Sequence, residues 1–301
     1  MALGEITLGP VLFNWPTEQW RDFYYRIADE APVGTVYVGE VVCSKRAPFF
    51  ADHIESVVAR LEAAGKTVVF STLAEVALDK DRQMVASVCA ASGNLVEAND
   101  PSALLRLRGR PHYVGPLVNV YNERTMAFLI RNGARSLCLP PEMPEEAIRH
   151  LCAEVGALAT IEVLVFGRLP LALSARCYHA RAHGRTKDSC KFVCEEDADG
   201  LSLRTLEGAP FLAVNGIQTL SHEYLNLVRE LSALGDMGVS GFRLSPHSCD
   251  MVKVATIFQR VLDGAIDSHE ATAALGALGL PAPFCNGFHH GRPGYEWMAG
   301  P

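Results

Sequence analysis

The sequence lacks several features that would place it quickly in a common class of protein. No apolar run is long enough to cross a bilayer, which takes about 20 predominantly apolar residues. The first residues, MALGEITLGPVLF, carry no basic segment ahead of an apolar one and do not read as a secretory signal. An excess of positive charge is also missing, because 27 Lys and Arg stand against 34 Asp and Glu, a net charge of −7. We therefore expect a cytoplasmic protein that does not depend on broad electrostatic attraction to nucleic acid or anionic membranes.

Short motifs of familiar enzyme classes are absent as well. The sequence contains neither the H-E-x-x-H of zinc proteases nor the G-x-S-x-G of serine hydrolases. The tripeptide GKT, residues 65–67, is similar to the end of a phosphate-binding loop, but Arg60 stands where that loop needs its first glycine. No catalytic residue can therefore be named from motifs of this kind.

What the sequence does contain is a regular alternation of short apolar runs and amphipathic helical patterns. This alternation is typical of a parallel sheet whose strands are joined by crossover helices. The eight strand candidates are residues 6–13, 35–42, 67–71, 95–99, 112–118, 136–140, 160–166 and 240–245. We predict an α/β fold, a (β/α)8 TIM-barrel-like domain with a cysteine-bearing insertion after strand seven.

The regular alternation stops after the seventh strand candidate. Residues 167–235 contain a cysteine-rich stretch, a predicted hairpin at 201–216 and a predicted helix at 222–235. We expect this segment to be an insertion on the carboxyl-terminal face of the barrel. The predicted domains are a barrel, 1–264, which includes the insertion, and a C-terminal helix with a Gly/Pro-rich tail, 265–301.

The chain has nine cysteines. In a reducing compartment they are expected to be buried thiols, metal ligands or redox groups rather than a disulfide framework. Cys89, Cys138 and Cys152 lie inside apolar helix or strand patterns and are expected to be core residues. For Cys249 and Cys285 both roles stay open, with a core position favoured.

The other four cysteines are expected to meet at the mouth of the barrel. Cys43 follows the second strand candidate and Cys177 lies beyond the seventh, and the loops after barrel strands converge on one face. Cys190 and Cys194 are four residues apart, so a helical turn would place both sulfurs on one side. Arg and Lys residues surround these thiols, and nearby cations lower a thiol pKa. We therefore predict a metal site formed by four cysteines.

The spacing of these cysteines favours iron and sulfide over zinc. Structural zinc sites with four cysteines usually show two close pairs, whereas here one C-x3-C pair is joined by two distant single residues. An iron-sulfur cluster is held by four thiolates and tolerates irregular spacing. A radical-SAM pattern would need a third cysteine at the position of Asp197. His179 and His183 are less favoured alternatives that could replace one cysteine.

Polar side chains at the ends of the strand candidates could line a substrate pocket at the barrel mouth. Each is equally compatible with a helix cap or a loop hydrogen bond. These residues are Asn14, Glu40, Ser71, Glu75, Asn99, Asn119, Arg168, Ser245 and His247.

Four blocks of sequence carry a resemblance to a known family. They are GPVLFNWP, GEVVCSKR, the run IEVLVFGRLPLALSARCYHARAHGRTKDSCKFVC, and the tail CNGFHHGRPGYEWM. Together they extend over nearly the whole chain and resemble the UbiV-like branch of the collagenase-like bacterial peptidase superfamily. Relatives described as peptidases have a cysteine where this chain has Pro170, which favours the UbiV-like branch over its UbiU-like sister.

The resemblance implies a 4Fe-4S cluster held by Cys43, Cys177, Cys190 and Cys194. It also implies a heterodimer with a UbiU-like protein, acting with a lipid-binding accessory protein of ubiquinone biosynthesis on a prenylated aromatic ubiquinone precursor. The implied role is oxygen-independent hydroxylation in anaerobic ubiquinone biosynthesis, for which the family is thought to use prephenate as oxygen donor.

Arg168 and Arg176 are hypotheses for binding a carboxylate beside the cluster. Two alternatives to this role stay open. The chain could be a peptidase of the same superfamily, although no nucleophile and base pair can be named, or a zinc-stabilised scaffold subunit without catalytic activity. Whether the chain is itself catalytic or only relays electrons is also open.

Overall fold

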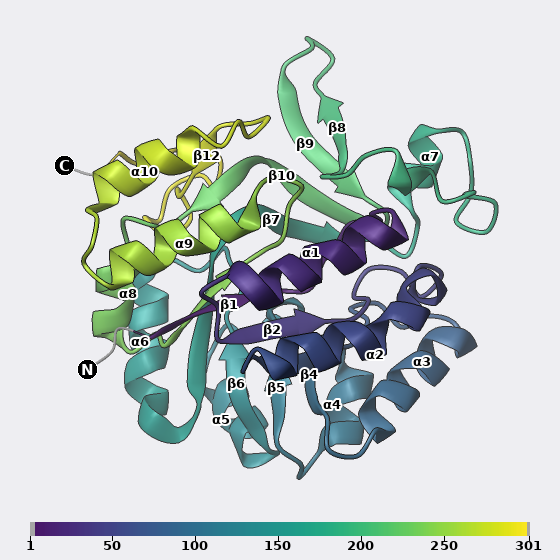
Figure 1. Ribbon diagram of the computed structural model, residues 1–301, viewed down its shortest axis with the longest axis horizontal. Helices are drawn as coiled ribbons and strands as arrows, with labels where there is room; N and C mark the ends of the chain where they lie inside the picture. Colours follow the sequence, from purple (N-terminus) through teal and green to yellow (C-terminus); the bar gives the residue numbers. More distant parts are fainter. Residues whose placement is uncertain (1–3, 300–301) are drawn as a thin grey trace.

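The computed structural model describes residues 4–299 and contains a closed barrel of eight parallel strands. The eighth strand, β11, pairs in parallel with both β1 and β7 and so closes the barrel. The predicted TIM-barrel-like fold is confirmed (Figure 1). The barrel strands are β1 (Glu5–Leu8), β2 (Thr35–Val38), β3 (Thr67–Ser71), β4 (Leu95–Ala98), β5 (His112–Val114), β6 (Ala134–Cys138), β7 (Thr160–Leu173) and β11 (Gly241–Leu244).

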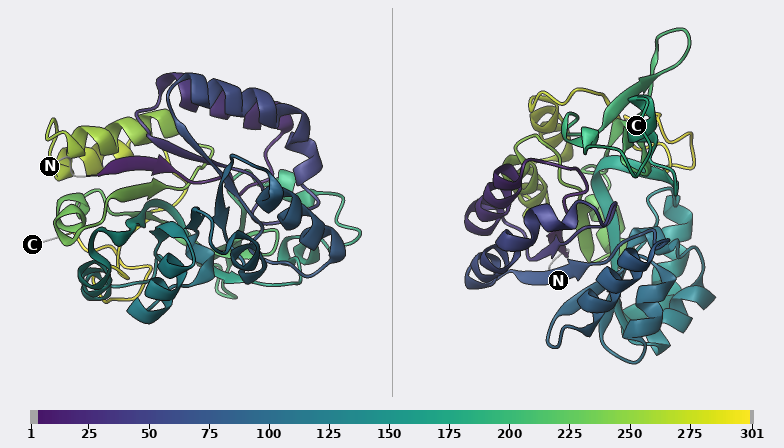
Figure 2. Two further views of the ribbon diagram at one scale, coloured as in Figure 1. Left: turned by 90° about the horizontal axis from the view of Figure 1, so that it is seen from below. Right: turned by 90° about the vertical axis from the view of Figure 1, so that its right-hand side faces the viewer.

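Helices cover the outside of the barrel (Figure 2), and their buried apolar residues join the hydrophobic core. Several begin at a side chain that caps their free N–H groups, as Asp100, Asn122 and Asp267 do. The helices around the barrel are α1 (Thr17–Glu30), α2 (Ala47–Ala63), α3 (Asp79–Ala90), α4 (Pro101–Leu107), α5 (Glu123–Arg131), α6 (Glu145–Val155), α8 (Leu231–Met237), α9 (Met251–Leu262) and α10 (Ser268–Gly276). Short 3-10 turns cover Pro116–Val118 (η1) and Gly156–Leu158 (η2).

Strand β7 continues past the barrel and carries the insertion. The predicted hairpin is present as β8 (Leu201–Arg204) and β9 (Pro210–Asn215), and it projects beyond the barrel in Figures 1 and 2. Before the hairpin come a short helix, α7 (Tyr178–Ala182), and a 3-10 turn, η3 (Val193–Glu195). The cysteine-rich stretch therefore connects β7 to the hairpin.

The helix predicted at 222–235 is wrong over most of its length. Residues Gln218–Asn226 form strand β10, and helix α8 begins only at Leu231. β10 lies antiparallel to both β7 and β9, so the long extension of β7 gains a hydrogen-bonding partner that a helix could not supply. The spacing of Leu and Val in this segment is compatible with a helix or a strand. The strand forms because it pairs with the otherwise free edge of β7.

The C-terminal tail returns to the insertion. Strand β12 (Phe284–Cys285) pairs in parallel with β10, which ties the end of the chain to the extension of the barrel. Within residues 4–299, no helix is both long and apolar enough to span a membrane.

Candidate metal-cluster site and barrel mouth

The structure brings Cys43, Cys177, Cys190 and Cys194 to the wall of one pocket. Cys43 lies in the loop after β2, and the other three lie in the connection from β7 to β8. This pocket, which we call the cysteine pocket, has an empty volume of about 390 Å³ including its open mouth. The four side chains predicted to converge therefore share one surface, whereas their binding of a cluster stays a prediction.

Local backbone structure sets the direction of each cysteine. The Cys177 side chain caps helix α7, with its Sγ atom 3.4 Å from the backbone nitrogen of Ala180. Cys190 and Cys194 do not lie on a helical turn, contrary to expectation. Lys191 and Phe192 between them adopt positive φ values of 48° and 54° and reverse the chain before Cys194 enters η3. Non-glycine residues rarely adopt this conformation, so the sequence gives no signal for it.

A buried cation lies beside the thiols. Arg46 is 1% exposed and donates hydrogen bonds to the backbone oxygen of Leu12 and to Asn215 Oδ1, both at 2.9 Å. Burial alone would lower the pKa of Arg46, yet the charges of Cys194 and Glu40 raise it overall. Both hydrogen-bond acceptors are neutral, so the charge of Arg46 offsets negative charge on Glu40 and on the wall of the cysteine pocket.

Burial and neighbouring charges both act on the pKa values of the thiols. Burial raises the pKa of Cys194, Arg46 opposes this effect, and the charges of Cys177 and Cys190 raise the pKa further. Burial also raises the pKa of Cys43. Thiolates at this site would repel one another, so deprotonating all four requires a strongly positive group between them.

A second cation comes from the neighbouring loop. Lys45 Nζ lies 3.4 Å from Cys190 Sγ and 2.7 Å from the backbone oxygen of Lys187. Lys187 in turn pairs with Glu75 at 3.2 Å, which fixes the loop over the pocket. The site therefore combines four soft sulfur donors with positive charge, a donor set that suits iron or zinc.

Zinc and iron-sulfur clusters differ in the sulfur spacing that they require. Within residues 4–299, no three His, Cys, Asp or Glu side chains surround one point closely enough to hold a single ion. Tetrahedral zinc would bring the sulfurs to about 3.8 Å from one another, since each Zn–S bond is about 2.3 Å long. A four-iron cluster binds each thiolate through a different iron, so its sulfurs stand further apart. The described residues show no ready-made single-ion site, and the kind of metal group that the four cysteines hold stays a prediction.

The two histidines considered as substitute ligands have other contacts. His179 lines the cysteine pocket, but its Nε2 atom lies 2.9 Å from Asp197 Oδ2. Burial lowers the pKa of His179, and Asp197 opposes this effect. The His183 ring stacks on that of His179 at 5.6 Å. Asp197, which occupies the position of a radical-SAM cysteine, therefore orients a histidine beside the site.

A second cavity opens at the barrel mouth. Of the polar residues expected there, Asn99, Arg168 and Ser245 line it, and Gln218 and Arg243 join them. The other predicted strand-end residues do not line this cavity. Among these, Glu40 accepts hydrogen bonds from the backbone of Val42 and Cys43, Ser71 donates to Glu97, Glu75 pairs with Lys187, and His247 accepts from the backbone N–H of Arg168. Arg176 is exposed and does not line the cavity.

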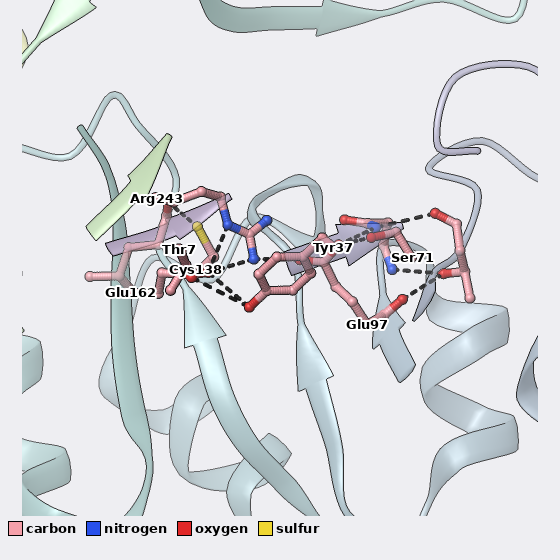
Figure 3. Close-up of polar contacts among 10 residues, drawn as sticks. Thr7, Tyr37, Ser71, Glu97, Cys138, Glu162 and Arg243 are labelled. Atoms are coloured by element: carbon pink, nitrogen blue, oxygen red, sulfur yellow. Dashed lines mark hydrogen bonds and ion pairs between the residues drawn. The ribbon is translucent and has the colours of Figure 1, made fainter. Parts of the chain in front are cut away.

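Charged residues inside the barrel were not predicted from the sequence. Arg243 forms ion pairs with Glu97, at 2.7 Å, and with Glu162, and its guanidinium lies 3.8 Å from the centre of the Tyr37 ring (Figure 3). Thr7 also donates a hydrogen bond to Glu162. The sequence does hold a signal for them, because the strand runs VEAN, IEVLVF and GFRLS each contain one charged residue. Side chains alternate between the two faces of a strand, so such a residue points into the barrel when its neighbours point outward.

Comparison with known proteins places the chain in a family. Solved structures similar to it include a U32 peptidase, with 13% identity, 82% of this chain and 94% of that chain covered, and a TM-score of 0.46. A candidate fructose-1,6-biphosphate aldolase from Coccidioides immitis has 10% identity, coverage of 92% and 87%, and a TM-score of 0.44. The sequence model of Peptidase family U32 matches residues 16–299. Because this match extends over nearly the whole chain, the protein belongs to Peptidase family U32.

Proposed function

We propose that this U32-family chain is the 4Fe-4S cluster-binding subunit of an oxygen-independent hydroxylation system in anaerobic ubiquinone biosynthesis. Its partner in the proposed heterodimer is a UbiU-like protein. The observation that carries the proposal is the cysteine pocket, where Cys43, Cys177, Cys190 and Cys194 share one wall. The sequence blocks that resemble UbiV-like proteins supply the pathway.

In this proposal the cluster supplies one-electron transfer when it is bound. The four cysteines hold it, and Arg46 and Lys45 offset the negative charge of the thiolates. Gly216 keeps the wall open, since a Cβ atom there would lie 2.9 Å from Arg46 Nη2. The lipid-binding accessory protein would present the prenylated aromatic precursor, and prephenate would be the oxygen donor.

Peptidase activity is the second candidate, because the family carries that name. A cysteine nucleophile works as a thiolate and needs a lowered pKa. Burial instead raises the pKa of Cys43 and Cys194. A raised pKa disfavours a resting thiolate nucleophile, whereas a bound metal would itself deprotonate a ligand thiol.

The test is anaerobic purification followed by a visible spectrum and assays of iron and sulfide. We expect a brown protein with about four irons per chain. Changing Cys43, Cys177, Cys190 or Cys194 singly to Ala should remove most of the iron. Cys249→Ala is the matched control, because Cys249 packs against the core outside the cysteine pocket and should leave the iron content unchanged.

Other outcomes identify the alternatives. A colourless protein that contains zinc would support the scaffold role, and cleavage of a peptide library by iron-free protein would support the peptidase. The pathway is tested by combining the chain with its UbiU-like partner without oxygen and measuring hydroxylated precursor by mass spectrometry. Product formation that survives loss of the iron would contradict the proposed role of the cluster.

A further inference from the structure

The cavity at the barrel mouth contains two buried hydrogen-bond donors that lack acceptors. Within residues 4–299, Arg168 Nε and Gln218 Nε2 have no partner, although Arg168 is 6% exposed and Gln218 1% exposed. Both side chains line the same cavity. Because buried donors are nearly always paired, two free donors on one cavity wall indicate an acceptor that occupies the cavity.

The surrounding structure fixes the orientation of Arg168. Its Nη1 atom donates to the backbone oxygens of Ser221, at 2.9 Å, and His222, and its guanidinium lies 4.6 Å from the centre of the Tyr224 ring. The backbone N–H of Arg168 donates to His247 Nε2 at 3.0 Å. None of these partners is a carboxylate, so the positive charge of Arg168 has no counter-charge among the ion pairs of the described chain.

The orientation of Gln218 follows from its neighbours. Arginine can only donate, so the Asn215 atom that receives Arg46 Nη2 at 2.9 Å must be Oδ1. Asn215 Nδ2 then donates to Gln218 Oε1 at 3.1 Å. The free end of the Gln218 amide is therefore its NH2 group. The hydrogen bonds from Arg46 to Asn215 and from Asn215 to Gln218 therefore leave the Gln218 NH2 group as a free donor at the cavity.

The remaining wall is mostly apolar. Glu97 and Arg243 lie at the cavity and already pair with each other at 2.7 Å. The cavity has an empty volume of about 470 Å³ including its open mouth. Its apolar lining residues are Leu12, Val41, Leu117, Leu164, Pro116 and Pro170. An occupant therefore needs one acceptor-rich anionic end and an apolar body.

We propose that the barrel-mouth cavity binds a small carboxylate-bearing molecule. Its carboxylate accepts hydrogen bonds from Arg168 Nε and Gln218 Nε2, and its apolar part contacts Leu12, Val41 and Leu164. A carboxylate can only accept hydrogen bonds, and its negative charge would supply the counter-charge that Arg168 does not find within the described chain. This proposal goes beyond the cluster-binding role and does not depend on it, because the cavity and the cysteine pocket have separate walls.

Isothermal titration of the anaerobically purified chain tests this site with benzoate as the probe. Benzyl alcohol, which has the same ring without the charge, and inorganic phosphate, an oxyanion without the apolar body, are the comparison ligands. We expect one benzoate per chain, bound about tenfold or more tightly than either comparison ligand. Equal binding of benzyl alcohol, or binding of phosphate as tight as that of benzoate, would overturn the assignment of a carboxylate.

Gln218→Glu is the deciding variant. It keeps the oxygen that accepts from Asn215 and replaces the free donor by an anionic oxygen, so benzoate binding at pH 8 should weaken by about tenfold or more. Arg168→Gln should also weaken binding, but it removes bonds that brace β10. Arg124→Gln is the control, an arginine that is 94% exposed and lies outside the cavity, and it should bind benzoate as the wild type does.

Unchanged benzoate affinity in a folded Gln218→Glu variant would overturn the proposal. Iron content, measured on the same samples, separates this result from the test of the cluster. Benzoate binding without iron would leave the cavity proposal standing and remove the cluster. Iron without benzoate binding would do the reverse.

Discussion

Replacing Arg243 by Met should destabilise the barrel strongly, because it leaves two carboxylates buried without a cation. Glu97 is 1% exposed, and Glu162 is 1% exposed. Arg243 is their shared partner, bonded through Nε to Glu162 at 2.7 Å and through Nη2 to Glu97 at 2.7 Å. Removing one partner of a buried ion pair lowers the free energy of unfolding by about 3–5 kcal/mol. That is a large part of the roughly 5–15 kcal/mol that stabilises a typical domain.

Urea unfolding measures this loss of stability. The triple variant Arg243→Met, Glu97→Gln, Glu162→Gln removes the stranded charges and should recover at least half of the loss. Lys253→Met is the control, because Lys253 is 69% exposed and its 3.6 Å pair with Asp250 contributes at most about 1 kcal/mol. A loss below about 1 kcal/mol for Arg243→Met, or no recovery in the triple variant, would refute the reasoning.

Two further predictions concern a close approach of the backbone and a buried histidine. At Gly216 φ is +61°, and a Cβ atom would lie 2.9 Å from Arg46 Nη2, so Gly216→Ala should lower the free energy of unfolding by about 1–3 kcal/mol and reduce the iron content. Gly208→Ala is the control, because φ is +85° there and an added Cβ atom would have no neighbour within 4 Å. It should show only the loss caused by the backbone conformation, in the same unfolding and iron assays. Equal losses in the two variants would contradict the role of Arg46. Burial lowers the pKa of His289 to about 4, so as the pH falls the unfolded chain binds a proton at this residue before the folded chain does. The free energy of unfolding should therefore decrease between about pH 6.5 and pH 4, by up to about 3 kcal/mol. His289→Gln should remove this part of the pH dependence in thermal unfolding scans, and an unchanged slope would show that other groups cause it.

The barrel could be predicted because its strands can be recognised from their local sequence. The run at 67–71, for example, is rich in β-branched and apolar residues, begins two residues after Gly65 at the end of a helix, and forms β3 as predicted. The stretch 218–226 has no such clear signal. This segment is a strand because it pairs with the free edge of β7, which lies about 50 residues earlier in the sequence. The spacing of apolar residues within the segment does not indicate such a distant contact.

The candidate sites divide in a similar way. Cys43 and Cys177 could be placed near each other from topology alone, because loops after barrel strands share one face. Arg46 could not, since an arginine next to a lysine in a loop reads as a solvated residue until its buried bonds to Leu12 and Asn215 are seen. The free donor of Gln218 was equally hidden, because it follows from the hydrogen-bonding direction of two neighbours.

The cysteine pocket takes one wall from the loop after β2 and the other from the segment after β7. During synthesis Cys43 leaves the ribosome long before Cys194, and β11, which closes the barrel, follows later still. A nascent chain therefore cannot assemble the complete set of thiols until most of its length has emerged. Any group that needs all four is captured only by a chain that has already brought both segments together, so occupancy of the pocket reports that these two segments have met.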